Sequence, residues 1–443
     1  MTAISTPPGR RVTTRKVLAI ALPIAVANLT IPLLTLADIA AVGQVPDAAL
    51  IGAVALGGVI FSFVFWGFSF LRMGTTGLTA QAFGADNRDE IRATLGRALL
   101  IAGGAGLLII ILQGPIAAIA FGLLHASARV EELARSYFAV RIWIAPLALS
   151  NFALTGWFIG RQRARIAVFL QLLLNGLNLT LDLTFVLVFG WGVPGVALGT
   201  DIAEGTAALL GLYIAARELK ALGGRWRLKR LLDPVRLRRT FTVNRDIMVR
   251  SLCLIFVLSF FTAQGAKTGD VTLAANEVLM QFILLAAFLL DAFGTASEAL
   301  VGESIGAQDR RGLIDAMKLP GLWALGVSLI LAAGFLLLGP FVIDILTREE
   351  AVRLAARTYL PWCAFAPLVA VWCFQLDSIF IGATLSHALR NAMMASLFVF
   401  LLAWWALHGP FGNHGLWAAM MIFYFARAAS LAFYLPGLLR RTL

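Results

Sequence analysis

The chain has 443 residues, of which 60% are hydrophobic and only 14% are charged. Soluble globular domains have roughly 45–50% apolar and about 25% charged residues, so this composition excludes an ordinary soluble protein. The formal net charge of +12 would suit nucleic acid, but the basic residues lie in alternate loops between apolar runs, so we expect no nucleic-acid partner.

Apolar runs of about 20 residues recur along nearly the whole chain, and each is long enough to cross a membrane. The fold class predicted from them is an all-α polytopic membrane protein with twelve transmembrane helices. In chain order the predicted helices are 17–42, 48–70, 92–113, 132–159, 165–190, 194–217, 247–267, 272–300, 312–338, 353–382, 388–408 and 414–437.

The loops between these helices alternate in charge. Basic residues gather in the second-to-third and fourth-to-fifth connections and in the middle loop, 218–246, whereas 43–49 and 191–193 are almost uncharged. Basic loops stay on the cytoplasmic side of a membrane. We therefore expect a multi-pass protein of the bacterial inner membrane, with both termini and the middle loop cytoplasmic.

Three short motifs recur at one spacing of 222 residues. Residues 84–88 recur at 306–310, 135–137 at 357–359, and 158–160 at 380–382. One register predicts a duplication, with two six-helix bundles related by a parallel pseudo-twofold axis. The predicted parts are an N-lobe (1–217, helices 1–6), a basic cytoplasmic linker (218–246) and a C-lobe (247–443, helices 7–12).

Two carboxylates lie inside predicted helices of the first half. Asp38 lies towards the outer end of helix 1, and Asp182 lies well inside helix 5. A charged carboxylate at the bilayer centre costs about 2.5–3.5 kcal/mol, so each needs a function or a compensating partner. A hydrogen bond that packs two helices, or a buried ion pair, is the structural alternative for each of them.

Helix 5 carries a polar stripe. Gln171, Asn175, Asn178 and Asp182 follow one another at spacings of four, three and four, which places them on one helical face. Such a stripe can line a wet cavity or bind a cation through its oxygens. Hydrogen bonding of the amides to neighbouring helices is the structural alternative.

Further candidates lie on helices 1, 6 and 10. Of Asp201 and Glu204 on helix 6, we expect one to face the same cavity as Thr200 and the other to pair with Arg141. Asp377 on helix 10 either serves the cavity or pairs with Arg427 of helix 12. On helix 1 the candidates for the cavity or for helix bending are Pro23, which permits a kink, and Asn28.

No enzyme motif is present in the sequence: it has no phosphate-binding P-loop, no zinc-protease motif and no paired aspartates for magnesium diphosphate. We expect no catalytic residues, no metal and no cofactor, so an ion gradient must supply the energy for any transport. A carboxylate in an apolar helix can bind and release a proton near neutral pH, because desolvation disfavours its charged form.

Together these segments resemble the multidrug and toxic compound extrusion (MATE) family, and within it the DinF-type, DNA-damage-inducible subfamily. The resemblance covers essentially the whole chain, and the segments that carry it are Pro23 with Ala37 and Asp38, 72–85, 178–182, 244–248 and 380–384.

The resemblance implies a two-lobed antiporter with a central cleft. It implies that Asp38 is the proton site, that Asn178, Asp182 and Thr200 line the same N-lobe cavity, and that helix 1 bends at Pro23. Some relatives couple to sodium through C-lobe acids. Asp377 matches one of these, but helix 7 has no acid between Ile247 and Gly265, which favours protons.

The sequence therefore predicts a proton-coupled antiporter, acting as a monomer among membrane lipids, that exports amphipathic, cationic organic compounds. The alternatives are sodium-coupled efflux, a lipid-linked oligosaccharide flippase of the same plan, and a membrane-embedded transferase. The duplicated register carries Asp38 onto Phe260 and Asp182 onto Trp404. We therefore expect a symmetric scaffold with ion coupling confined to the first half.

Overall fold

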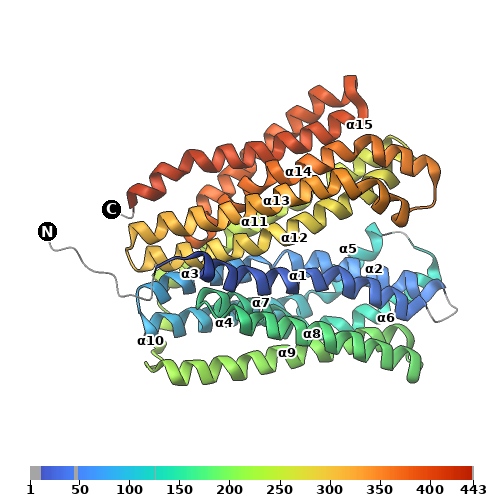
Figure 1. Cartoon of the computed structure of the whole chain (residues 1–443). Helices are drawn as coiled ribbons and strands as arrows, with labels where there is room; N and C mark the ends of the chain where they lie inside the picture. Colours follow the sequence, from blue (N-terminus) through green and yellow to red (C-terminus); the bar gives the residue numbers. More distant parts are fainter. Residues whose placement is uncertain (1–10, 44–47, 125, 442–443) are drawn as a thin grey trace. The chain divides into compact units, whose positions relative to one another are not determined.

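The structure is a computed structural model that describes residues 11–43, 48–124 and 126–441, with the side chains of 31–43, 48, 66, 228 and 441 left undescribed. Every regular element in these ranges is helical (Figure 1). The elements are α1 (Thr14–Gly43), α2 (Ala48–Trp66), α3 (Phe70–Gly84), α4 (Arg88–Ile111), α5 (Gln113–Leu123), α6 (Ala128–Arg141), η1 (Ile142–Ile144), α7 (Ala145–Gly160), α8 (Ala164–Leu183), η2 (Thr184–Val188), α9 (Gly192–Leu222), α10 (Leu228–Leu231), α11 (Pro234–Lys267), α12 (Asp270–Gly306), α13 (Arg310–Leu346), α14 (Glu350–Gly382) and α15 (Ser386–Arg441).

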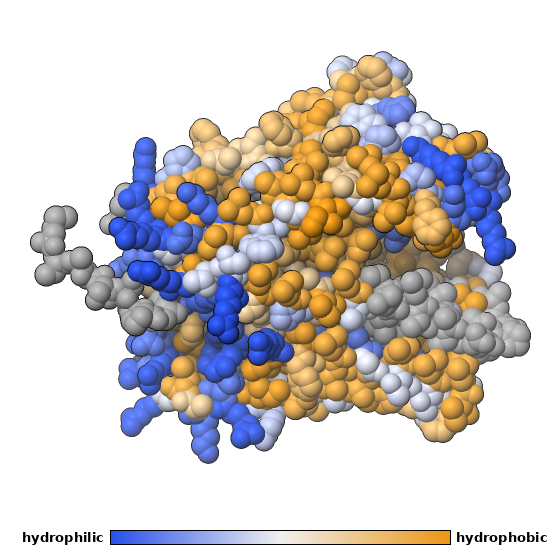
Figure 2. All heavy atoms as spheres, in the orientation of Figure 1, coloured by the Kyte–Doolittle hydropathy of each residue, from blue (hydrophilic) through white to orange (hydrophobic). Residues whose placement is uncertain are grey.

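Nine segments within the described ranges are long and apolar enough to cross a membrane. Large apolar side chains on these helices face outward, among them Ile111 at 75% exposure, Leu337 at 80% and Phe433 at 83%. In Figure 2 hydrophobic residues cover the middle of the helices and hydrophilic ones gather towards the ends. Such surfaces are stable against lipid and not against water, which confirms the predicted class of all-α polytopic membrane protein.

Two helix boundaries differ from the prediction by more than ten residues. The chain predicted as a loop after residue 70 continues as α3, because its small residues pack against α7 and bury Gly74 and Thr76. The linker predicted over 218–246 contains α10 and the first turns of α11. Asp233 caps α11, since its Oδ1 accepts the backbone N–H of Val235 at 2.9 Å, and Pro234 occupies the first turn.

The last two predicted helices both lie within α15 and are separated by a kink at Gly412, inside the predicted break between them. Gly412 has φ of 52° and ψ of −128°, which are not helical values, so the chain changes direction there. Gly190, which is 222 residues earlier, has φ of 66° and lies in the connection from η2 to α9. Positive φ is accessible to glycine at little steric cost. The turn after helix 5 and the turn after helix 11 therefore share a backbone feature in one register.

The sequence repeat is also a repeat of backbone conformation. Among described residues other than glycine, positive φ occurs at Asp86, Gln162, Gln308 and Thr384, which form two pairs at the 222-residue spacing. Each is the left-handed residue of a turn that ends a helix. The residue that follows each donates its N–H to the carbonyl five residues earlier, at 2.8 to 3.0 Å. The duplicated motifs thus encode duplicated helix ends.

A close helix contact repeats in the same register. A Cβ on Gly160 would lie 2.6 Å from the backbone oxygen of Thr76, and a Cβ on Gly382 would lie 2.3 Å from that of Glu298. Only glycine lets the two backbones approach so closely. The repeated glycines therefore fix how α7 packs on α3 and how α14 packs on α12.

The chain divides into two compact units. The N-unit is Val26–Phe241, and the C-unit comprises the chain up to Ala25 and from Thr242 onward. In the N-unit α7 packs against α3, α4 and α9; in the C-unit α14 packs against α12, α13 and α15. Both central helices end at a repeated glycine, Gly160 or Gly382. The predicted assignment of two lobes and a separate linker stays a prediction.

Candidate functional site

A buried polar cluster in the N-unit joins α8 to α9. The side-chain amide of Asn178 donates to Asp182 Oδ2 and to Thr200 Oγ1, both at 3.0 Å. Thr200 in turn donates to the backbone oxygen of Val196 at 2.9 Å. Asp182 is 1% exposed and Asn178 is 4% exposed. The structure therefore brings together three of the predicted coupling residues through one amide.

A glycine on α9 makes room for the acid of this cluster. A Cβ on Gly199 would lie 2.3 Å from Asp182 Oδ1 and 3.3 Å from the backbone nitrogen of Asp182. Real Cβ atoms do not approach an oxygen that closely, so the carboxylate occupies the space that the missing side chain leaves. Gly199 thereby positions Asp182, a role that sequence reasoning missed because it depends on the crossing of two helices.

The polar stripe of α8 continues beyond this cluster and reaches α1. Gln171 donates to Asn175 Oδ1 at 3.0 Å, and Asn175 donates to Thr30 Oγ1 at 2.7 Å. The four stripe residues thus form two hydrogen-bonded pairs along one face of the helix, as their spacing predicted. The bond from Asn175 to Thr30 is also the interhelical contact expected under the structural alternative.

The structure describes the candidates on α1 unevenly. Pro23 and Asn28 are both half-buried, and α1 stays helical through Pro23. The side chain of Asp38 lies outside the described residues. The bending of helix 1 at Pro23 and the proton-binding role of Asp38 both stay predictions.

The acids of helix 6 both pair with one arginine, which corrects the expectation that only one would. Arg141 of α6 contacts Glu204 at 2.7 Å and Asp201 at 3.3 Å. The guanidinium also lies over the rings of Phe61 and Phe65. The sequence did not decide between the two acids because, one helical turn apart on α9, both lie within reach of the same side chain.

The C-unit contains a buried acid held by two arginines. Asp377 of α14 accepts hydrogen bonds from Arg427 of α15, which confirms the predicted pair of these two residues. It also accepts hydrogen bonds from Arg250 of α11, a partner that sequence reasoning missed. All three side chains are at least nine-tenths buried. A basic residue within an apolar run, as Arg250 is, was the signal that could have revealed this partner.

A second ionic cluster of the C-unit surrounds Asp246, in the first half of α11. Asp246 is 1% exposed and accepts from Arg245, Arg390 and Ser386, each at 3.0 Å. The buried acids of the C-unit described so far, Asp246 and Asp377, are therefore both engaged by arginines. This differs from the N-unit stripe, where amides and hydroxyls supply the hydrogen bonds.

Comparison with known families identifies the scaffold. The MatE family model matches the chain twice, over residues 23–184 and again over residues 247–405. The chain belongs to the MATE family. It is a transporter of the DinF-type branch, since it is 39% identical to DNA damage-inducible protein F of Escherichia coli over 93% of this chain and 90% of that protein.

More distant relatives and solved structures agree with this family. The chain is 22% identical to the probable multidrug resistance protein NorM of Bacillus subtilis over 96% of both chains. Its fold is similar to an outward-facing MATE transporter of the MOP superfamily, with a TM-score of 0.88 at 17% identity over 99% of this chain and 100% of that one. It is also similar to the bent form of VcmN from Vibrio cholerae, with a TM-score of 0.86 at 19% identity over 97% of each chain.

These findings support a multi-pass protein of the bacterial inner membrane that belongs to a family of transporters of small molecules and not of enzymes. The duplicated family match lies in nearly the same register as the short motifs and the repeated turns.

Proposed function

We propose that this MATE transporter is a proton-coupled antiporter that exports amphipathic, cationic organic compounds by alternating access. In this proposal twelve transmembrane helices form two six-helix bundles, and both termini face the cytoplasm. The basic character of the chain between α9 and α11 supports that orientation, because basic loops stay in the cytoplasm. Asp38 and Asp182 carry the proton, and Asn178 and Thr200 orient the carboxylate of Asp182.

The observation that carries the proposal is the polar cluster around Asp182. Its carboxylate is almost wholly buried, lies within an apolar helix and accepts a hydrogen bond from a neutral amide. A carboxylate in such a place changes its hydrogen bonding when it binds a proton. Because Asn178 links it to Thr200 on α9, protonation can loosen or tighten the packing of two helices.

The repeat supports a contact between the two acids of the proposal. Phe260 and Trp404, the counterparts of Asp38 and Asp182, lie edge to face with ring centroids 4.9 Å apart. Phe400, the counterpart of Asn178, also contacts Phe260 at 5.8 Å. If the duplicated halves share their helix packing, Asp38 adjoins Asp182 and Asn178. Two such acids titrate as a coupled pair, so one proton binds more readily than two.

The environment of Asp377 favours protons over sodium as the coupling ion. Two arginines already neutralise this carboxylate, so a sodium ion would have to displace a guanidinium to bind there. The buried charge of this group is positive overall. A lipid-linked oligosaccharide flippase would also use buried positive charge. A flippase is therefore the alternative that transport assays must distinguish from proton-coupled export.

The proposal is tested with the full-length protein in liposomes, with imposed pH or sodium gradients and a cationic dye as substrate. We expect a pH gradient to drive dye transport and a sodium gradient to have little effect. Asp38→Asn and Asp182→Asn should each lower pH-driven transport at least about tenfold while thermal unfolding stays unchanged. Glu132→Gln, which alters an exposed acid, is the matched control. Full activity of Asp182→Asn, or transport driven by sodium alone, contradicts the proposal.

A further inference from the structure

A pocket in the N-unit lies apart from the acid cluster. It has a volume of about 500 Å³ and lies between α4 and α9, at the helix ends that adjoin the basic chain segment 223–231. Leu95 and Leu99 line it from α4, Leu212 and Leu219 line it from α9, and Trp226 closes one side. The part formed by the two transmembrane helices is therefore apolar.

The other end of the pocket is basic. Arg92 is 7% exposed, and its Nε donates to the backbone oxygen of Gly223 at 2.8 Å. Among the residues that the structure describes, Arg92 Nη1 makes no hydrogen bond and Lys220 makes no ion pair. Lys220 is exposed and also lines the pocket. One buried and one exposed cation thus meet at the same end.

Two glycines fold the segment 223–231 back over Arg92. Gly223 and Gly224 have φ of 72° and 80°, and a Cβ on Gly224 would lie 3.0 Å from Asp89 Oδ1 and 3.4 Å from Arg92 Nε. A larger residue at position 224 would be strained and would press on both charged groups. The glycines therefore allow a backbone oxygen to hold the guanidinium while Trp226 lies beside it, 5.9 Å from ring centroid to Cζ.

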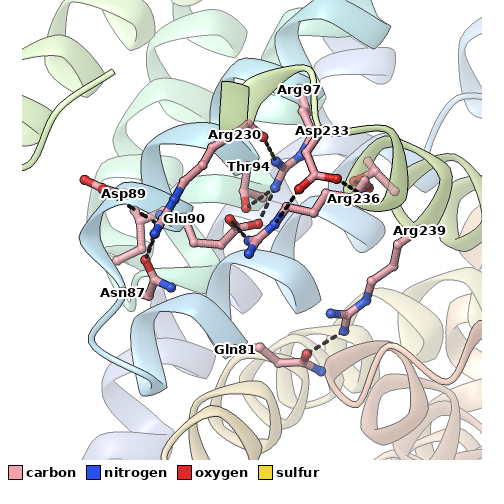
Figure 3. A network of polar contacts seen from close by, with 12 residues as sticks. Gln81, Asn87, Asp89, Glu90, Thr94, Arg97, Arg230, Asp233, Arg236 and Arg239 are labelled. Carbon is pink, nitrogen blue, oxygen red and sulfur yellow. Dashed lines mark hydrogen bonds and ion pairs between the residues drawn. The ribbon is translucent and has the colours of Figure 1, made fainter. Parts of the chain in front are cut away.

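The acids near this segment are already engaged by other arginines. Figure 3 shows Asp89 beside Arg230, and Glu90 between Arg97 and Arg236. Arg97 also donates to the backbone oxygen of Arg230 at 3.0 Å. These contacts hold the segment 223–231 against α4, and the arginines neutralise Asp89 and Glu90 of α4. The charge left at the mouth of the pocket is that of Arg92 and Lys220.

The two helices that line the pocket also carry exposed apolar side chains elsewhere along their length. Leu100 and Leu107 of α4 are 53% and 58% exposed, and Leu209 and Tyr213 of α9 are 61% and 58% exposed. An occupant with an anionic head and an apolar tail would match both ends. Basic pockets between transmembrane helices bind the head groups of anionic lipids.

We propose that this pocket binds one anionic phospholipid, with its phosphate at Arg92 and Lys220 and an acyl chain along Leu99 and Leu212. In the topology of the proposed function these helix ends face the cytoplasm, so the lipid comes from the cytoplasmic leaflet. The bound lipid would join the segment 223–231 to α9 and α4.

The test measures lipid retention by the full-length protein, with native mass spectrometry after exchange into detergent containing phosphatidylglycerol or phosphatidylcholine. The wild type should retain phosphatidylglycerol in preference. Lys220→Gln should weaken that retention about fivefold, the effect of one basic side chain near an anionic surface. Lys229→Gln removes an exposed charge of the same segment outside the pocket and should change nothing. Ala216→Phe, which fills the pocket, should abolish the preference.

Equal retention of the two lipids would overturn the proposal, and so would equal effects of Lys220→Gln and Lys229→Gln. Displacement of phosphatidylglycerol by millimolar inorganic phosphate would also overturn it, because the site would then be one for small anions. Lipid retention is measured without any transport assay. A negative result for lipid therefore does not contradict proton-coupled transport, and a negative transport result does not contradict lipid binding.

Discussion

The N-unit and the C-unit share their turns and differ in their buried chemistry. Asn178 and Asp182 of the N-unit correspond to Phe400 and Trp404 of the C-unit, where aromatic rings contact Phe260. The C-unit instead buries Asp377 between two arginines. Both units bury ion groups, since Arg141 of the N-unit pairs with Asp201 and Glu204, but only the N-unit has acid and amide side chains, those of Asp182 and Asn178, at the two positions that Trp404 and Phe400 occupy in the C-unit.

The largest expected effect comes from breaking the ion group of the C-unit. Asp377→Ala leaves the charges of Arg250 and Arg427 buried beside each other, which should cost about 3–5 kcal/mol of stability. The measurement is the thermal unfolding midpoint of the protein in detergent. Glu132→Ala is the control, because it breaks an exposed pair with Arg129, at 3.2 Å, and should cost less than about 1 kcal/mol. If the Asp377→Ala protein is as stable as the wild type but inactive, then both units contain an acid that is needed for transport.

Next in size are the two repeated helix contacts. Gly160→Ala and Gly382→Ala each force a methyl group against a backbone carbonyl, and each should cost about 1–3 kcal/mol, measured by thermal unfolding. Gly176→Ala and Gly334→Ala are the matched controls in the two units, because a Cβ at either site meets open space. If only one of the two contacts proves sensitive, the packing of the halves is less alike than their sequences indicate.

The smallest expected effect concerns the position of the Asp182 carboxylate in the N-unit. Gly199→Ala places a methyl group where the Asp182 carboxylate lies, so the carboxylate must move away from Asn178. We expect transport in liposomes to fall about tenfold, equivalent to about 1.4 kcal/mol in the transport step. Gly205→Ala on the same helix, whose Cβ would lie 3.5 Å from Ile144, should transport normally. Normal transport by Gly199→Ala would mean that the position of Asp182 is unimportant.

The sequence predicted those features that depend on local pattern. Apolar length predicted the membrane class, and the spacing of Asn175, Asn178 and Asp182 predicted their common face. The shared register predicted a duplication, and the left-handed residues Asp86 and Gln308 lie at the same spacing. Each of these features depends on residues that are close in the chain or on a match between two short segments.

Features that depend on helix packing could not be predicted in the same way. The contact of Arg250 with Asp377 spans 127 residues, and the contact of Gly199 with Asp182 depends on where two helices cross. The early start of α11 is different, because Asp233 and Pro234 are a recognisable start signal that hydropathy alone overlooked.

The left-handed residues in the repeated turns also carry a cost in free energy. A residue other than glycine in this conformation costs roughly 1–2 kcal/mol, and the four of them form two pairs at one spacing. The packing around these turns must therefore offset a similar cost in each unit. The two units thus share the strained turns of their framework, while Asp182 and Trp404 differ at one matched position.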